Sequence, residues 1–132
     1  MMTRVLVIED SDQLRMIATR FLKWGGFDVL EASKGSAGLA MFAEHGADVL
    51  LTDVHLGDLN GNDVIRSLRM ARASLPVVVM TGSVQGLPGA RIVDADLESS
   101  VSLLYKPFTQ AQLSASIEDA VARRPLGAPD AE

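Results

Sequence analysis

The sequence has no cysteine, few aromatic residues and no apolar stretch long enough to cross a membrane. Without cysteine the chain forms neither disulfides nor thiolate metal sites, and it suits a reducing compartment. The first apolar run, at residues 4–8, is too short for a secretory signal sequence. A membrane-spanning helix needs about 20 apolar residues in succession. We therefore expect a cytoplasmic protein without a membrane partner.

Basic residues are also scarce, with 12 Lys and Arg against 17 Asp and Glu and a net charge of −5 at pH 7. They are dispersed and form no stripe of the kind that binds duplex nucleic acid. We therefore expect no nucleic-acid partner and favour protein partners. At 132 residues, of which 48% are hydrophobic, the chain has room for one domain with one core.

Short apolar runs alternate with segments of helical periodicity along the chain. The runs that predict strands are residues 4–8, 27–31, 47–53, 76–80 and 101–105. The first segment that predicts a helix is capped by Ser11 or Asp12 and stops at Gly25-Gly26. The others are residues 33–44, a segment with Val64, Ile65 and Leu68, residues 90–97 and residues 109–121. Such alternation indicates a doubly wound α/β domain, a parallel sheet with helices on both faces. We expect this domain at residues 1–122 and a disordered tail, with two prolines and a glycine, at residues 123–132.

Polar side chains follow four of these strands at the point where each strand ends. Glu9 and Asp10 come after the first strand, Asp53 after the third, Thr81 after the fourth and Lys106 after the fifth. Because the carboxyl ends of parallel strands meet in one crevice, these side chains should form a single site. Carboxylates, a hydroxyl and an ammonium can hold a hard cation such as Mg²⁺ beside an anion such as phosphate. The pattern therefore predicts phosphoryl chemistry.

Each of these residues also has an ordinary structural explanation when it is taken alone. An acidic pair such as Glu9-Asp10 often caps a helix, and Thr81 is a β-branched residue that suits a strand. Lys106 is harder to explain in this way, because no amphipathic pattern requires a charge there. Pro107 is a candidate for a cis peptide bond, because such bonds occur at prolines in tight turns. The combination, more than any single residue, indicates a functional site.

The chain resembles the receiver domains of bacterial two-component response regulators over residues 3–121. The matching motifs are I-E-D-S, L-T-D-V-H-L with Gly61 eight residues after its aspartate, M-T-G-S and K-P-F-T. Together these motifs are specific for the family. The resemblance implies a flavodoxin-like fold, with a five-stranded parallel sheet in the strand order 2-1-3-4-5.

The resemblance also assigns a phosphoacceptor and a metal site. It implies that Asp53 accepts a phosphoryl group from a sensor histidine kinase or a histidine phosphotransfer protein. Mg²⁺ is expected to bind Asp10, Asp53 and the backbone carbonyl of His55. Glu9 is expected to support the metal through a water molecule. The cofactor implied by the resemblance is therefore Mg²⁺ alone.

Further residues are expected to act on the phosphoryl group. By the same resemblance, Thr81 hydrogen-bonds the phosphoryl oxygens and Lys106 pairs with their charge. His55 lies two residues after the acceptor, where its side chain either faces the bound group or faces water. If it faces the site, His55, with Ser83 across the site, sets the lifetime of phospho-Asp53, either by shielding the bond or by orienting the attacking water.

Three positions depart from the usual pattern of the family. Gly57 stands where proline is common, so the loop after the acceptor lacks a fixed φ. Leu103 stands where a switch aromatic is usual, and Tyr105, on the same face of the strand, could take over its role. A glycine-rich segment at residues 82–98 stands where the family begins a regular helix. These departures concern the output surface and not the phosphorylation site.

The sequence thus predicts a stand-alone receiver that catalyses its own phosphorylation and dephosphorylation and switches a surface for an unknown downstream protein. No output domain is expected, because the predicted elements use up the chain before the tail. One alternative is a receiver-like binding module that signals without phosphorylation. A less favoured one is a haloacid-dehalogenase-type phosphatase with an aspartate nucleophile. Members of that family carry the motif D-x-D, and here His55 occupies the place of the second aspartate.

Overall fold

A computed structural model of the chain describes residues 2–82 and 93–123. These residues form an α/β fold with a five-stranded parallel sheet in the order β2-β1-β3-β4-β5. The strands are β1 (Arg4–Ile8), β2 (Asp28–Ala32), β3 (Val49–Asp53), β4 (Val77–Thr81) and β5 (Ser102–Tyr105). The flavodoxin-like fold and its strand order, as predicted from the sequence, are confirmed.

Four α-helices lie within the described residues. They are α1 (Asp12–Trp24), α2 (Gly35–His45), α3 (Gly61–Ala71) and α4 (Gln110–Ala122). The side chain of Ser11 caps α1 by accepting the Leu14 N–H. Thr109 and Gln112 form a capping box at the start of α4. None of the helices in the described part of the chain is long and apolar enough to span a membrane.

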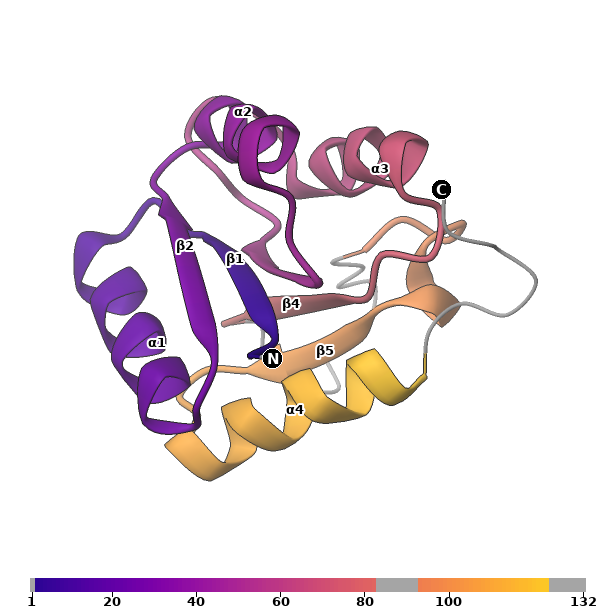
Figure 1. Cartoon of the computed structure of the whole chain (residues 1–132). Coiled ribbons are helices and arrows are strands. Elements are labelled where there is room, and N and C mark those ends of the chain that lie inside the picture. The colour runs from indigo at the N-terminus through magenta and orange to yellow at the C-terminus, as the bar shows by residue number, and fades with distance from the viewer. Residues whose placement is uncertain (1, 83–92, 124–132) are drawn as a thin grey trace.

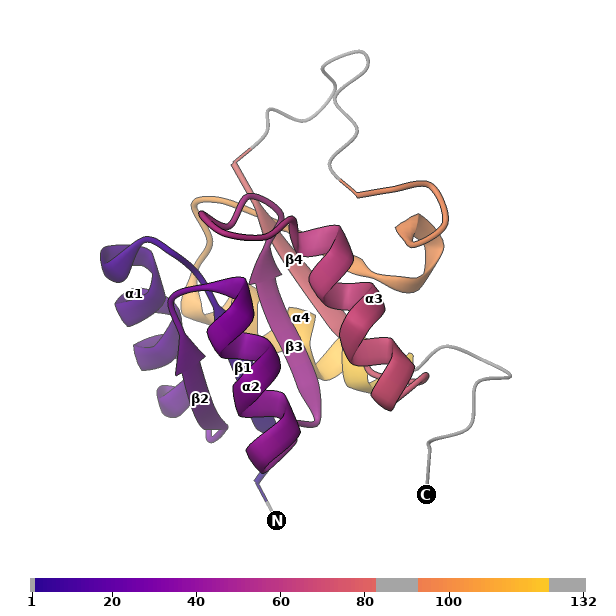
Figure 2. The same cartoon turned by 90° about the horizontal axis from the view of Figure 1, so that it is seen from above.

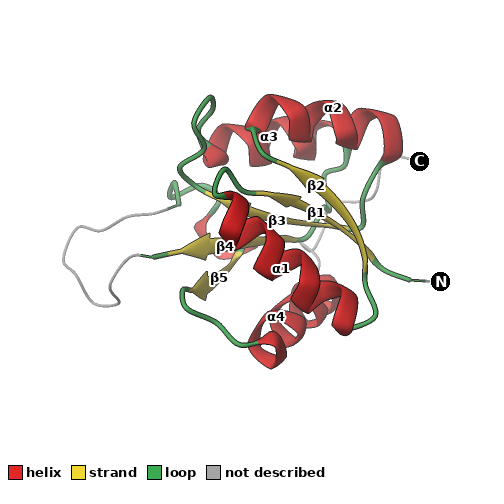
Figure 3. Ribbon diagram, turned by 90° about the vertical axis from the view of Figure 1, so that its left-hand side faces the viewer, coloured by secondary structure: helices red, strands yellow, loops and turns green. Residues whose placement is uncertain are grey.

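The helices cover both faces of the sheet. α2 and α3 pack on one face, and α1 and α4 pack on the other (Figure 1). Figure 3 shows the same three layers after a quarter turn, with α2 and α3 above the sheet and α1 and α4 below it. The alternation of side chains along each strand divides the core: Leu6 and Ile8 of β1 contact the α2 and α3 side, whereas Val5 and Val7 contact the other.

The helix predicted at residues 90–97 is wrong over its described part. Residues 93–97 form a turn, followed by a short 3-10 helix at Glu98–Ser100. The Asn62 side chain accepts the Asp94 N–H at 2.9 Å, and Arg66 binds the carboxylates of Asp94 and Asp96 at 2.6 and 2.7 Å. These contacts with α3 fix the segment, and a local sequence pattern does not contain them. Residues 90–92 lie outside the described residues.

The carboxyl ends of the strands point to one edge of the sheet, where the β1–α1, β3–α3 and β5–α4 connections lie. Seen from above, this edge carries the loop between β3 and α3 beside the N-terminus of α2 (Figure 2). Parallel strands place their C-terminal side chains at the same edge by construction. The polar residues predicted to form a site therefore begin the loops of this edge. Residues 124–132 of the expected tail lie outside the described residues.

Candidate functional site

The centre of the site is an ion pair between the ends of β3 and β5. The Lys106 ammonium lies 2.7 Å from Oδ2 of Asp53. Asp53 is the last residue of β3, and Lys106 directly follows β5, so β4 separates the two strands that carry them. Both side chains are largely buried, with 15% and 26% of their surface exposed. An ammonium held at a carboxylate can stabilise further negative charge that develops there.

Glu9 is a buried carboxylate in the same cluster. It is 1% exposed, and its Oε2 accepts the Ser11 N–H at 3.1 Å. Its Oε1 has no hydrogen-bond partner and lies 3.5 Å from the Lys106 ammonium. Burial, and after it the hydrogen bond with the side chain of Asp10, raise the pKa of Glu9 to about 7, against the lowering effect of the Ser11 N–H and the Lys106 charge. A buried carboxylate oxygen without a donor is a position where a cation would be stabilised.

Lys106 holds its charge despite partial burial. Burial lowers the pKa of Lys106, but the hydrogen bond and the charge of Asp53, together with Glu9, outweigh it and raise the pKa above its usual value. The ammonium therefore stays protonated throughout the physiological range. The two carboxylates thus fix a permanent positive charge beside Asp53.

The loop between β3 and α3 folds back over the end of β3. His55 donates its backbone N–H to Oδ1 of Asp53 at 3.1 Å, while the residue itself is exposed. His55 also forms an isolated antiparallel bridge with Asn60, whose side chain caps α3. The Gly61 N–H closes the loop by donating to the Val54 carbonyl at 2.7 Å. The Asp53 carboxylate is thus held at both oxygens, by a backbone amide and by an ammonium.

The remaining predicted phosphoryl-binding residues lie at the ends of β4 and β5. Thr81 is the last residue of β4 and is 4% exposed, and its carbonyl accepts the Lys106 N–H at 2.8 Å. The Lys106–Pro107 peptide bond is cis. Ser83 lies outside the described residues. The structure therefore brings Thr81 and Lys106 together through the backbone, at the end of β4 and just after the end of β5.

A divalent metal fits the chemistry of this cluster. The atoms of the cluster that could bind a metal are all oxygens, the ligand type that Mg²⁺ prefers. They include Oε1 of Glu9, which has no hydrogen-bond partner. Among residues 2–82 and 93–123, no three side chains of His, Cys, Asp or Glu are grouped to hold a metal. The ligand set implied by the resemblance, Asp10, Asp53 and the carbonyl of His55, contains only two side chains. It stays a prediction.

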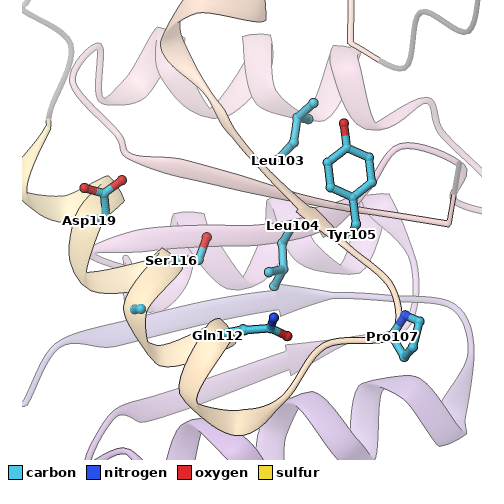
Figure 4. Close-up of a pocket in the computed structure, with 8 residues that line it drawn as sticks. Leu103, Leu104, Tyr105, Pro107, Gln112, Ser116 and Asp119 are labelled. Carbon is cyan, nitrogen blue, oxygen red and sulfur yellow. The ribbon is translucent and has the colours of Figure 1, made fainter. Parts of the chain in front are cut away.

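A groove lies between β5 and α4, next to the site. Its lining residues are Leu103, Leu104, Tyr105, Pro107, Gln112, Ala115, Ser116 and Asp119. Figure 4 shows Leu103 and Tyr105 on one side of β5 and Leu104 on the other, as the period of two along a strand requires. Leu103 and Tyr105 are 39% and 38% exposed. The two candidate switch residues therefore share a face, and whether Tyr105 replaces the usual aromatic stays a prediction.

Two residues near the site carry contacts that the sequence did not reveal. Arg15 donates from Nη1 to the backbone carbonyl of Glu9 at 2.7 Å, which ties α1 to the end of β1. Asp58 accepts the N–H groups of Gly35 and Ser36 at 2.8 and 3.0 Å, which ties the β3–α3 loop to α2. Neither pair has a spacing that a helix or strand pattern would signal.

Comparison with known proteins finds a matching family model and relatives of this chain. The family model of the response regulator receiver domain matches residues 5–118. The sensory transduction protein RegX3 of Mycobacterium tuberculosis is 35% identical over 123 residues, which are 93% of this chain and 52% of that protein. The cell cycle transcriptional regulator CtrA of Caulobacter vibrioides is 30% identical over 128 residues, 94% of this chain and 52% of that protein. The chain thus spans about half the length of these curated relatives.

Solved structures give the same result for the fold. A response regulator receiver domain protein from Clostridium thermocellum is similar with a TM-score of 0.79 and 29% identity, covering 92% of this chain and 96% of that one. The chemotaxis response regulator CheY4 of Vibrio cholerae has a TM-score of 0.80 at 23% identity, covering 91% and 99%. At that identity the second likeness concerns the fold alone.

Proposed function

Because this chain belongs to the family of response regulator receiver domains, we propose that it accepts a phosphoryl group on Asp53 and changes a protein-binding surface in response. Receiver domains are phosphorylated by histidine kinases, and we propose such a kinase, or a histidine phosphotransfer protein, as the donor. The observation that carries the proposal is the Asp53 carboxylate held 2.7 Å from the Lys106 ammonium at the carboxyl edge of the sheet.

The chemistry follows from the two groups that hold Asp53. A carboxylate oxygen of Asp53 attacks the phosphorus of the donor, the bond from phosphorus to the donor's nitrogen or oxygen breaks, and an acyl phosphate forms. The backbone N–H of His55, bonded at Oδ1, orients the carboxylate for this attack. The Lys106 ammonium, bonded at Oδ2, pairs with the negative charge of the incoming group.

Receiver domains typically bind Mg²⁺ for phosphorylation. We propose that Asp10, Asp53 and the backbone carbonyl of His55 would hold it here, with Glu9 in support through water. Bound Mg²⁺ supplies positive charge that lowers the repulsion between an anionic phosphoryl group and a carboxylate. Thr81 would donate its hydroxyl hydrogen to a phosphoryl oxygen.

The direct test is phosphorylation by a small acyl phosphate. The native chain is incubated with acetyl phosphate and Mg²⁺, and its intact mass is measured. We expect one added phosphoryl group, which hydroxylamine removes because it cleaves acyl phosphates. If no mass is added even when Mg²⁺ is present, the result favours the alternative of a binding module that works without phosphorylation.

We expect Asp10→Asn to weaken Mg²⁺ binding more than Glu9→Gln. Asp10 would contact the metal directly, whereas one oxygen of Glu9 is already occupied by the Ser11 N–H. The loss for Asp10→Asn should be at least about 10-fold, because replacing even a supporting group costs about 10–100-fold in metal affinity. Isothermal titration with Mg²⁺ measures both affinities. The reverse order would mean that the two carboxylates exchange roles.

We expect His55→Ala to shorten the lifetime of phospho-Asp53 by a few-fold. The backbone of His55 is bonded to the acceptor, and the residue is exposed, which supports a place for its side chain on the solvent side of the acceptor, where water attacks. The chain's other histidine, His45 at the end of α2, provides the control variant His45→Ala. Loss of the phosphoryl group from purified protein is followed by mass spectrometry. Unchanged decay would place the imidazole in water, and slower decay would mean that it orients the attacking water.

The pathway around this reaction stays a prediction. Because the chain spans about half of its curated relatives, the activities of those whole proteins are not carried over. The interpretations as a stand-alone receiver, as a cytoplasmic protein and as a partner of an unknown downstream protein each stay predictions. They do not enter the tests above, which need only the chain, Mg²⁺ and a small donor.

A further inference from the structure

Asp58 makes an unusual long-range contact at the edge of the site. Its carboxylate accepts the backbone N–H of Gly35 at 2.8 Å and of Ser36 at 3.0 Å, and these residues are 23 and 22 positions away. Gly35 and Ser36 are the first two residues of α2. The preceding residue, Lys34, forms no side-chain cap. Asp58 therefore caps α2 from the β3–α3 loop, and its charge is stabilised at the positive end of the helix dipole.

The carboxylate stays charged in this position. The Ser36 amide and hydroxyl, followed by the Gly35 amide, lower the pKa of Asp58 to about 2. Near neutral pH the cap is thus a carboxylate acting on two amides, the stronger kind of hydrogen bond. Leu59 packs closely against the start of α2. A Cβ added at Gly35 would lie only 2.9 Å from the Leu59 Cβ. Two successive loop residues thus contact the first turn of α2.

The same loop fixes the backbone of His55. The two ends of the loop are joined at its base by the bridge between His55 and Asn60 and by the hydrogen bond from the Gly61 N–H to the Val54 carbonyl. Between the two ends lies Gly57, whose surroundings are open: a Cβ placed there would meet no atom within 4 Å. Glycine gives a loop more backbone freedom than any other residue. The hydrogen bonds of Asp58 to α2, with the Leu59 contact beside them, therefore limit the freedom of the middle of this loop.

We propose that Asp58 is a positioning residue for phosphoryl transfer to Asp53, because it fixes the loop that presents the backbone of His55 to the acceptor. The inference rests on the proposed function and adds a residue to it. Asp58 has no contact with the reacting atoms; it acts through the His55 N–H, which orients Asp53, and through the His55 carbonyl, the expected metal ligand. Groups that hydrogen-bond a metal ligand directly change activity or metal affinity by about 10–100-fold, and Asp58, which acts through the loop, is expected at the lower end of this range.

The test compares Asp58→Ala and Asp58→Asn with a matched control. Asp48 offers the control, because its Oδ2 also accepts a distant backbone N–H, that of Arg4, at 2.7 Å. Asp48 directly precedes β3 and so lies at the opposite edge of the sheet. Two quantities are measured for each variant: the initial rate of phosphorylation by acetyl phosphate at several Mg²⁺ concentrations, and the exchange rate of the His55 amide hydrogen by NMR without metal.

We expect Asp58→Ala to lower the phosphorylation rate at limiting Mg²⁺ by about 10-fold and to speed exchange of the His55 amide. Asp58→Asn keeps an acceptor oxygen and should restore part of both quantities, while Asp48→Ala should change neither. Native values in Asp58→Ala, or equal losses in Asp58→Ala and Asp48→Ala, would overturn the proposal. If the native chain takes up no phosphoryl group, the proposed function fails, whereas the exchange rates still report whether Asp58 holds the loop.

Discussion

Replacing Asp53 with asparagine should abolish phosphoryl uptake from acetyl phosphate, with a fall in rate of more than about 1000-fold. The amide lacks the charged nucleophilic oxygen, and it removes the carboxylate that the Lys106 ammonium binds at 2.7 Å. Glu9 has a similar pair of neighbours, the Ser11 N–H and the Lys106 ammonium, but it is 1% exposed, so a phosphoryl donor reaches it less easily than Asp53, whose side chain is 15% exposed. Intact-mass measurement after incubation with acetyl phosphate and Mg²⁺ gives the result directly.

The matched control for this substitution is Asp63→Asn. Asp63 lies on α3 with 73% of its side chain exposed, and its contact is with Arg66. We expect this variant to be labelled like the native chain, and both variants to retain their circular dichroism spectra. Labelling of Asp53→Asn at the native rate would show that Asp53 is not the phosphoacceptor. Loss of labelling in Asp63→Asn as well would point to a general effect of acidic charge.

Replacing Gly61 with alanine should destabilise the protein by about 3 kcal/mol, the upper end of the usual cost of overpacking. Gly61 begins α3, and there alanine would otherwise be favoured by its helix propensity, by about 1 kcal/mol. The added Cβ, however, would lie 2.4 Å from the Asp53 carbonyl oxygen and 2.7 Å from the Val54 Cα. Both neighbours are backbone atoms, so relief requires the end of β3 to shift. Urea unfolding followed by circular dichroism measures the change in free energy.

The control for Gly61→Ala is Gly57→Ala in the same loop. A Cβ at Gly57 would meet no atom within 4 Å, and the residue has no positive φ. Alanine there should leave stability unchanged or raise it by about 0.4–1 kcal/mol, because it restricts the unfolded chain. Because the end of β3 carries Asp53, the proposed acceptor, Gly61→Ala should also slow phosphorylation, and Gly57→Ala should not. Equal stability of the two variants would contradict the close approach of Gly61 to β3.

The fold could be predicted from the sequence because its signals are local. The three central strands β1, β3 and β4 are mainly apolar and buried, and all five strands were predicted within two residues of their observed bounds. Helix starts were less accurate where the cap is distant. α2 begins at Gly35 and not at residue 33, because its capping carboxylate is Asp58, in a loop 23 positions further along. No pattern within the helix itself contains that information.

The candidate site was predictable to the extent that strand ends determine it. The contact between Asp53 and Lys106 follows from the position of each at the end of a parallel strand. The contacts of Arg66 with Asp94 and Asp96 do not follow from any such rule, and they replace the expected helix by a turn over residues 93–97. The periodic spacing of Val93 and Leu97 suits both a helix and this turn, since both residues join the same core cluster.

The position of Lys106 also determines when, during synthesis, the proposed phosphorylation site becomes complete. Asp53 and Lys106 are 53 positions apart, and the strands that carry them are joined only through β4. A nascent chain that has emerged only as far as β4 already contains the acidic residues but lacks the ammonium. Its sheet is also incomplete, because β5, the edge strand beside β4, has not yet been made. If Asp53 accepts a phosphoryl group as we propose, its uptake needs the complete sheet, and acetyl phosphate labelling then measures the progress of refolding.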